Sequence, residues 1–563
     1  MESKEITLLK NARIYTCNEE MPLAEAVAFA GDEIVYVGTA EGAPACGEVF
    51  DLEGKTVLPG IIDSHIHPGM VSQSSWHIRL PWTRDLDEIL NFIKEYAEKH
   101  PKEEIPFLYF EYYPTDLFGS KGPHKKYLDA VVSDRPVFCQ DFGEHQHWIN
   151  SAMLEAMGVT KETPDPIPGL QEFVRDENGE PTGWCKELVC SREEFTEPLF
   201  RSIGWEPPIT MTPELMTAFF SFLSDHGITA IGDGLIEGEE QLASMAQLDA
   251  GGKLNVYYDG VVRFDSLQEL PEKILLCKKY QEKYGDRHLR IRTMKLFLDG
   301  TNETGNSASL HPHRNDPAGE NYGEIAMSEE DLYQCFLLCN EAGLDLHIHM
   351  VGDRAFRVGC NAVERAQEEC RRRGIPWTCQ PIFAHCEIVD PEDMPRPARL
   401  GITINWSCHW SGGYFGEEAR TFFSDEKWER MYQFNPIIDS GALFACSSDV
   451  VTFYELHRAD PFFGMQVAAT RVDPEFPLDE SRYPGSVRPP ASARLSVETL
   501  LKGYTLNGAK QLRREGELGT IEAGKKANLC VISEDLFQVP PEQLARIRWE
   551  AVIFDGKLIR GRL

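Results

Sequence analysis

The chain has 563 residues, 42% of them hydrophobic and 10% aromatic, enough for a large core divided over two or three compact units. Its formal net charge of -34 argues against nucleic acid and anionic membranes as partners. Its 15 irregularly spaced cysteines predict no disulfide framework, and no run of about 18 apolar residues predicts a membrane span. We therefore expect a cytoplasmic protein, without a signal peptide, that acts on a small-molecule substrate.

Short strands with turns open and close the chain. They are predicted at 6–9, 12–15, 26–29 and 33–38, and again at 527–532, 551–554 and 557–560. Asp555-Gly556 is a hairpin signal between the last two. We expect the two ends to pair into one small composite β-sandwich domain. It would comprise residues 1–56 and, after a last barrel helix, the rest of 491–563.

The middle of the chain alternates strands with helices. Strands are predicted at 229–233, 291–298, 344–350, 380–385 and 443–447, and helices at 218–223, 329–342 and 362–373. This alternation is typical of an α/β fold with a parallel sheet, and its length favours a TIM-like (β/α)₈ barrel over residues 57–490. The stretch of about 74–211 breaks the rhythm with irregular aromatic and proline content. We expect it to be an insertion after the first barrel strand that caps the site.

Histidines and an aspartate follow several of these strands. The first apolar strand ends in His65-Ile66-His67, and strand alternation places both imidazoles on one face, where they could hold a divalent metal ion. His349, His385 and Asp449 each end a separate predicted strand. Because the carboxyl ends of barrel strands meet at one face, these side chains should converge. Packing of a buried histidine would explain any one of them, but it explains the whole set poorly.

Lys295 lies inside the apolar strand at 291–298. A buried ammonium group is costly unless its charge is paired or removed. One interpretation is a salt bridge, for instance with Asp299. The other is a reaction of the amine with CO₂ to form a carbamate, an anionic oxygen ligand that can bridge two metal ions. The sequence leaves both interpretations open.

The sequence resembles the amidohydrolase superfamily and, within it, the branch of N-substituted formamide deformylases and YtcJ-like enzymes, amidohydrolase family 3. The resemblance runs over nearly the whole chain. The segments similar to the family's strand and sheet motifs are Leu58 to His67, Lys295 with Asp299-Gly300, His349 with Gly352 to Ala355, His385, Ser448-Asp449 and Glu517 to Leu529. The resemblance implies a TIM-like barrel with a small β-domain, one or two divalent metal ions, usually zinc, and a homodimer.

Some positions match the family less closely. His347 forms a second His-x-His with His349, and the family's spacing to Gly-Asp selects His349 as the ligand. His145, followed by Trp148 and Asn150, resembles a segment in which the histidine lies near the substrate, with His147 as the competing candidate. His409 is the one residue that agrees with the Gln-Pro-x-His segment of relatives. The roles of His147, His347 and His409 stay open.

These residues predict a metal-dependent hydrolase that cleaves a C–N bond, in an amide, an N-acyl or N-formyl compound or a cyclic amide, by metal-activated hydroxide. In this hypothesis His65, His67 and Asp449 hold one metal ion. A second ion is held by His349 and His385, and carboxylated Lys295 bridges the two. Asp449 passes the proton of the water to the departing amine, and His145 hydrogen-bonds the substrate carbonyl or oxyanion.

Other functions fit the same site. A deaminase or an ester or lactone hydrolase could use the same ligands, and a non-catalytic metal-binding protein is a remote alternative. An oxidoreductase is disfavoured because no Gly-x-Gly-x-x-Gly follows a strand. An apolar or aromatic substrate group is suggested by Trp148, Trp406, Trp410, Tyr414 and Phe415, although ordinary core packing would also explain these residues.

Overall fold

A nearly closed barrel forms the centre of the protein. The computed structural model describes residues 6–314, 318–414 and 417–563. Eight strands, each parallel to its neighbours, form one sheet. They are β8 (Ile61–Ile66), β15 (Ile228–Asp233), β16 (Tyr257–Arg263), β17 (Leu289–Phe297), β18 (Asp345–Met350), β19 (Pro381–His385), β20 (Thr403–Ser407) and β21 (Leu443–Ser447). Ser64 Oγ donates to the Cys446 carbonyl at 2.8 Å, joining the first strand to the last. The predicted TIM-like α/β barrel is confirmed.

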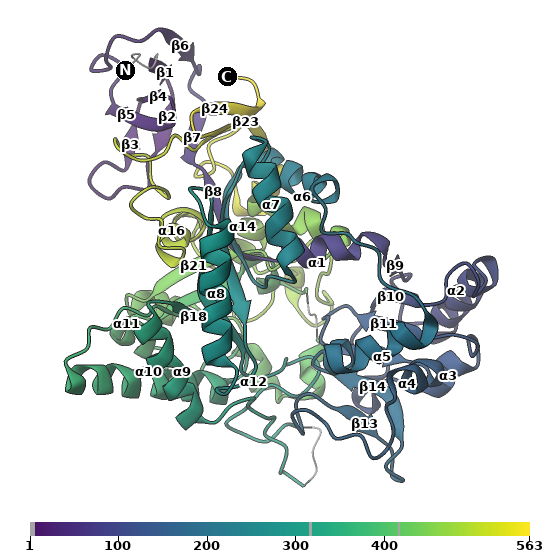
Figure 1. The fold of residues 1–563 in the computed structure, drawn as a ribbon. Helices are drawn as coiled ribbons and strands as arrows, with labels where there is room; N and C mark the ends of the chain where they lie inside the picture. The colour runs from purple at the N-terminus through teal and green to yellow at the C-terminus, as the bar shows by residue number, and fades with distance from the viewer. Residues whose placement is uncertain (1–5, 315–317, 415–416) are drawn as a thin grey trace.

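Helices follow the barrel strands and pack outside the sheet (Figure 1). They are α6 (Pro213–Asp225), α7 (Glu239–Ala250), α8 (Leu270–Tyr284), α9 (Glu329–Ala342), α10 (Asp353–Arg373), α11 (Arg396–Leu400), α12 (Asp425–Glu429), α13 (Asn435–Asp439), α14 (Pro461–Thr470), α15 (Val497–Lys502) and α16 (Gly508–Gln511). The limits of α9 match its prediction, because Ser328 caps its first turn and Gly343, with φ of 72°, ends it. By contrast, α10 begins at Asp353 rather than at residue 362. Helices and strands share one large hydrophobic core.

Both ends of the chain meet in a β-sandwich beyond one end of the barrel (Figure 1). Its sheets have the orders β5-β4-β1-β6 and β24-β23-β22-β7-β2-β3. The strands are β1 (Ile6–Lys10), β2 (Arg13–Tyr15), β3 (Leu23–Ala24), β4 (Ala26–Ala30), β5 (Glu33–Gly38), β6 (Glu48–Asp51), β7 (Thr56–Pro59), β22 (Leu529–Ile532), β23 (Trp549–Phe554) and β24 (Lys557–Gly561). Val57 of β7 lies opposite Val531 of β22. Since β8 begins after Gly60, this pairing anchors the first barrel strand.

A separate lobe lies between β8 and α6 in the sequence and beside the barrel in space (Figure 1). Its sheet has the order β13-β14-β12-β11-β10-β9. Its elements are β9 (Ile78–Arg79), α2 (Leu86–Lys99), β10 (Leu108–Tyr113), α3 (Lys125–Asp129), β11 (Val137–Asp141), β12 (Gln146–Ile149), α4 (Ser151–Met157), β13 (Phe173–Arg175), β14 (Pro181–Lys186) and α5 (Glu193–Ile203). The short helix α1 (Pro68–Gln73) precedes the lobe and packs against α6 of the barrel. Phe138 packs into one hydrophobic cluster, and Val137 and Cys139 pack into another, because alternate residues of β11 face opposite sides of the sheet.

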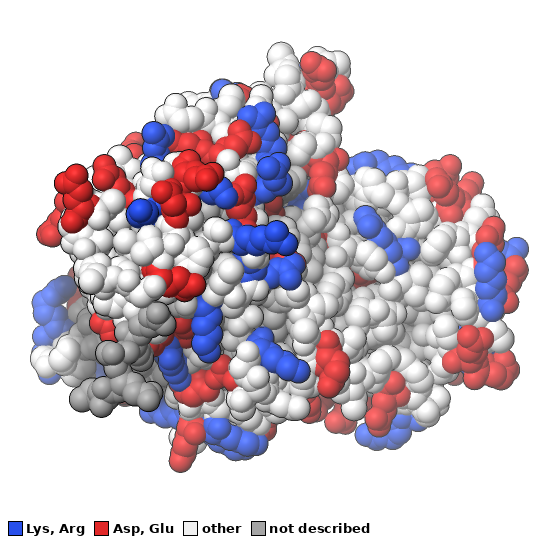
Figure 2. Space-filling model, turned by 90° about the horizontal axis from the view of Figure 1, so that it is seen from above, with Lys and Arg blue, Asp and Glu red and all other residues white. Residues whose placement is uncertain are grey.

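The surface carries charges of both signs. On the face seen in Figure 2, acidic and basic side chains are interspersed. In the described part of the chain, no helix is both long enough and apolar enough to cross a membrane. The cysteines are free thiols, and most of them are buried.

Candidate metal centre and active site

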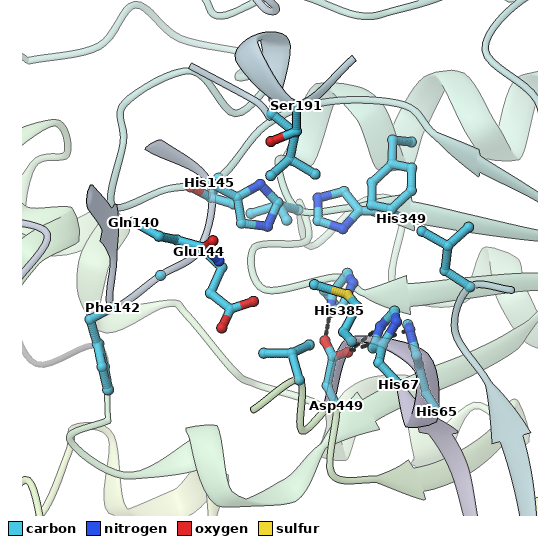
Figure 3. A pocket seen from close by; sticks show the side chains of 18 of the residues that line it. His65, His67, Gln140, Phe142, Glu144, His145, Ser191, His349, His385 and Asp449 are labelled. Atoms are coloured by element: carbon cyan, nitrogen blue, oxygen red, sulfur yellow. Dashed lines mark ion pairs between the residues drawn. The ribbon is translucent and has the colours of Figure 1, made fainter. Parts of the chain in front are cut away.

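His65, His67 and Asp449 meet at the carboxyl ends of β8 and β21 (Figure 3). Nε2 of His67 lies 3.0 Å from Oδ1 of Asp449, and Nε2 of His65 lies 3.5 Å from the same oxygen. One donor atom from each residue lies within 4.8 Å of the other two. Two imidazoles and a carboxylate that converge in this way form a donor set suited to a divalent metal ion.

A second pair of histidines lies on the other side of Asp449. His349 and His385 end the neighbouring strands β18 and β19, and their ring centroids are 4.4 Å apart. Nδ1 of His385 is 3.5 Å from Oδ2 of Asp449, and Nε2 of His349 is buried without a hydrogen-bond partner. Burial lowers the pKa of His385 to about 3 and the pKa of His349 well below its usual range. Both rings are therefore neutral and can offer a nitrogen lone pair.

Lys295 extends from β17 into the same group. Its Nζ lies 3.5 Å from Nε2 of His65 and 5.0 Å from the ring centroid of Phe297. No carboxylate in the described ranges forms an ion pair with this amine. Burial lowers the pKa of Lys295 to about 8, so the neutral and nucleophilic amine is accessible near neutral pH.

Asp299 does not pair with Lys295. Its carboxylate accepts hydrogen bonds from the backbone N–H groups of Ala308 (2.8 Å), Val351 (2.9 Å) and Gly352 (2.9 Å). The interpretation of a salt bridge between Lys295 and Asp299 is therefore wrong. The carboxylate instead ties the segment after β17 to the segment after β18, next to His349.

His145 enters the site from the loop before β12. Its Nδ1 lies 2.7 Å from Oε2 of Glu187, and its ring centroid lies 5.4 Å from that of His349 (Figure 3). Burial opposes protonation, but the charge and hydrogen bond of Glu187 outweigh it and raise the pKa of His145 to about 9. The protonated ring can donate a hydrogen bond to a group in the cavity.

Two of the histidines left open by the sequence lie away from the cavity. His147, on β12, places Nδ1 3.0 Å from the Cys190 thiol. His347 faces the barrel interior one inward position before His349, and its ring packs edge-on against that of His65 at 4.6 Å. Of the two candidates in the insertion, the residue that lines the cavity is His145.

His409 supports the loop that carries Asp449. Its Nε2 is 2.7 Å from the Ser448 carbonyl oxygen, and its Nδ1 accepts a hydrogen bond from Arg458 at 3.0 Å. Both ring nitrogens are used, which excludes a ligand role in this arrangement. From the other side, Asp63 accepts hydrogen bonds from the Ser448 backbone N–H and hydroxyl at 3.0 and 2.5 Å. Ser448 is thus fixed from both sides.

The cavity above these residues has a volume of ≈ 300 Å³ and is lined by both the barrel and the insertion. Glu144 of the insertion points towards Asp449 (Figure 3). Two predicted aromatic residues, Trp410 and Tyr414, line the cavity, and Trp410 stacks on His385 with centroids 5.4 Å apart. Part of the wall is therefore apolar.

The other aromatic predictions do not apply to this cavity. Trp148 is fully buried in the insertion, where its Nε1 donates to the His124 carbonyl at 3.0 Å. Trp406 is fully buried in the barrel core, 4.7 Å from the ring of Tyr432. For both residues, core packing explains their presence. Phe415 lies outside the described residues.

The comparison with known proteins places the chain in a family. A family profile described as "Amidohydrolase family" matches residues 48–560. The chain belongs to this family. The chain is 26% identical to the putative amidohydrolase YtcJ of Bacillus subtilis (97% of this chain, 98% of that protein). It is also 26% identical to an N-substituted formamide deformylase of Arthrobacter pascens (98% of this chain, 97% of that protein).

Three further proteins are similar to this chain. The chain is 29% identical to the exoenzymes regulatory protein AepA of Pectobacterium carotovorum, over 76% of this chain and 90% of that protein. Uncharacterized metal-dependent hydrolases from Pyrococcus horikoshii and Pyrococcus furiosus align with TM-scores of 0.66 and 0.63 at 21% and 22% identity. Each alignment covers 95% of this chain, with 99% and 100% of the respective structures. These structures share the fold of this chain.

The structure also reveals a site residue that the sequence analysis missed. Gly234 follows β15, and a Cβ atom there would lie 2.4 Å from Nε2 of His65 and 2.5 Å from Cε1 of His67. Any side chain would displace both rings. In addition, the ligand candidates His385 and Asp449 have left-handed φ angles of 73° and 55°, a strained conformation that is typical of functional sites.

Proposed function

We propose that this amidohydrolase cleaves a C–N bond of a small amide, N-acyl, N-formyl or cyclic amide compound at a divalent metal centre, with zinc as the expected ion. The observation that carries the proposal is the convergence of histidines, an aspartate and an unpaired buried lysine at one end of the barrel. The relative named N-substituted formamide deformylase, which aligns over 98% of this chain, supports a C–N bond as the target.

The donor set fits one or two metal ions. His65, His67 and Asp449 would hold one ion, and His349 and His385 would hold another. Lys295, as its carbamate, would bridge them. Among the described residues, Nε2 of His349 has no hydrogen-bond partner and Lys295 has no carboxylate within ion-pair distance, and both observations support this assignment. A bound divalent ion supplies a Lewis acid that polarises the carbonyl and lowers the pKa of water from 15.7 towards about 7.

Asp449 and His145 would handle the protons and the developing charge. Burial raises the pKa of Asp449, but its hydrogen bond to His67 and its interactions with His385 and Lys295 lower the pKa more, below its usual range. The carboxylate is therefore ionised. It would take the proton of the attacking water and deliver it to the departing nitrogen, a poor leaving group until it is protonated. Protonated His145 would donate a hydrogen bond to the carbonyl oxygen as negative charge develops there.

The metal content of protein purified without chelators tests the proposal. We expect about two ions per chain in the wild type and fewer in Lys295→Ala, because the bridging ligand is lost. A carbamate carbon signal in protein equilibrated with ¹³C-labelled bicarbonate should appear in the wild type and disappear in the variant. About one ion, unchanged in Lys295→Ala, would make Lys295 structural, and no metal would overturn the central claim.

Product analysis tests the reaction itself. Hydrolysis of an amide panel should release an amine and a carboxylate in equal amounts. Release of ammonia from an amino-substituted ring would indicate a deaminase. Turnover restricted to esters or lactones would indicate an ester or lactone hydrolase. Tight metal binding without turnover of any compound would contradict an enzymatic role.

A further inference from the structure

A second and larger hollow opens beside the catalytic cavity, between the insertion and the barrel. Its volume is ≈ 1280 Å³, against ≈ 300 Å³ for the catalytic cavity. The residues that line both hollows are Gln73, Tyr109, Ser191 and Glu237. Because they share these four lining residues, the two hollows adjoin each other.

One wall of this hollow consists of aromatic side chains of the insertion, which are Trp76, Phe107, Tyr109, Phe200 and Trp205. We call the hollow bounded by this aromatic wall the insertion groove. The ring centroid of Trp205 lies 5.6 Å from that of Trp76, 5.4 Å from Phe107 and 5.8 Å from Phe200. Trp76 in turn lies 5.4 Å from Tyr109. The aromatic wall therefore extends without a break to the edge of the catalytic cavity.

The wall packs on the insertion core but keeps accessible apolar surface. Trp76, Tyr109, Phe200 and Trp205 are half-buried against the core cluster of the insertion. At the rim, Ile209 is 78% exposed. Accessible aromatic surface in a hollow of this kind is typical of a ligand-binding site.

We propose that the insertion groove binds an elongated apolar or aryl substituent of the amide substrate while the scissile bond lies in the catalytic cavity. This inference rests on the proposed function. The occupant is the substrate itself, because the groove adjoins the catalytic cavity along lining residues that the two share. A cavity of ≈ 300 Å³ lies at the lower limit for ligand sites, so a larger substrate needs the additional space.

Two substrate series test the proposal and show which side of the amide enters the groove. In N-alkyl formamides the chain is on the amine side, and in N-methyl alkanamides it is on the acyl side, each running from methyl to decyl. In wild-type holoenzyme we expect kcat/KM to rise about fourfold per methylene in one series until the groove is filled, since each buried methylene favours binding. The dissociation constant from calorimetry should fall in parallel.

Variants at the wall and the rim should reduce this dependence on chain length. Trp205→Ala removes part of the wall, and Ile209→Glu places a charge at the rim without removing buried packing. Both variants should lower kcat/KM for decyl compounds many times more than kcat/KM for methyl compounds. Phe92→Ala is the matched control, because Phe92 is a half-buried aromatic residue of the same insertion, on α2, outside the groove. It should leave the dependence unchanged.

The outcomes separate this inference from the proposed function. Hydrolysis of methyl amides with no chain-length dependence in either series would overturn the groove and leave the function intact. A dependence that survives in both Trp205→Ala and Ile209→Glu would overturn it as well. If no amide is hydrolysed, the proposed function fails. Calorimetry then tests the groove separately. Affinity for the compounds that still rises with chain length, and that falls in Ile209→Glu, would support the groove, and affinity without this dependence would overturn it.

Discussion

Asp449 connects the ligand candidates with one another. Its two carboxylate oxygens face His65 and His67 on one side and His385 on the other. Its left-handed backbone is held by Ser448, which is bonded from both sides. Because both its carboxylate and its backbone are held in place, Asp449 is positioned for chemistry rather than for stability alone.

Asp449→Asn tests the proton transfer. Asparagine keeps an oxygen for the metal but cannot accept a proton, so we expect kcat to fall by about 10²–10⁴-fold. Turnover and metal content should be measured on the same samples. Asp439→Asn, on the exposed end of α13, is the control and should behave as wild type. Wild-type turnover by Asp449→Asn with metal bound would exclude the proton transfer.

Glu187→Gln tests the charge of His145. The imidazolium is present below its pKa of about 9 and lost above it, so kcat/KM of the wild type should fall as the pH rises through about 9. Without the Glu187 charge the pKa of His145 falls, and the alkaline decline of kcat/KM should move to lower pH. An alkaline limb at the same pH in both proteins would contradict a role for protonated His145.

At the level of residues, the sequence could predict the side chains that follow barrel strands, because strand ends and residue types are both local information. Glu187 and Gly234 were missed because their roles depend on contacts with His145 and His65, far away in the chain. Trp148 and Trp406 were misassigned because composition shows an aromatic side chain but not which core receives it.

The barrel strands bring the residues of the site together. At the position that follows β15, the backbone lies so close to the side chains of a neighbouring strand that no further side chain fits. Gly234 follows β15 and lies against both rings of the His-x-His pair of β8. We expect Gly234→Ala to displace these rings and weaken metal affinity by about 10–100-fold with little change in the folded structure. A metal titration measures the affinity, and circular dichroism measures the folded structure.

Gly516→Ala is the matched control for Gly234→Ala. A Cβ atom at Gly516 meets no atom within 4 Å, and this backbone is outside the left-handed region. It should bind metal as the wild type does. Equal metal affinity in Gly234→Ala and wild type would show that His65 and His67 are not ligands in the arrangement described.

Two barrel strands were not predicted, and both carry buried polar residues. In β16, Asp259 accepts a hydrogen bond from Arg290 at 2.8 Å. In β20, Asn405 donates to the hydroxyl of Ser64 at 2.8 Å and to Gln511 at 2.9 Å. These polar residues interrupt the apolar runs by which the other strands were recognised. Their partners come from distant elements, so the sequence pattern alone could not show that they are satisfied.

At the scale of the whole molecule, bound metal should stabilise the fold, because the ligand candidates come from strands that span the barrel. Ligand binding stabilises a native protein by about 2.7 kcal/mol at a free concentration of 100 times Kd. We expect chelation to lower the melting temperature and added zinc to restore it, as followed by calorimetry. His65→Ala should show a smaller shift, and equal melting temperatures with and without saturating zinc would contradict a metal centre.

The pairing of β7 with β22 has a consequence for biosynthesis. The ribosome releases β7 early, but it reaches β22 only after the entire barrel has been translated, which takes tens of seconds at ordinary rates. During that interval one edge of β7 has no partner and is open to aggregation or chaperone binding. A truncated product that lacks β22 to β24 would keep this edge exposed directly before β8, the strand that carries His65. Such an exposed edge would remain available for recognition by cellular quality control.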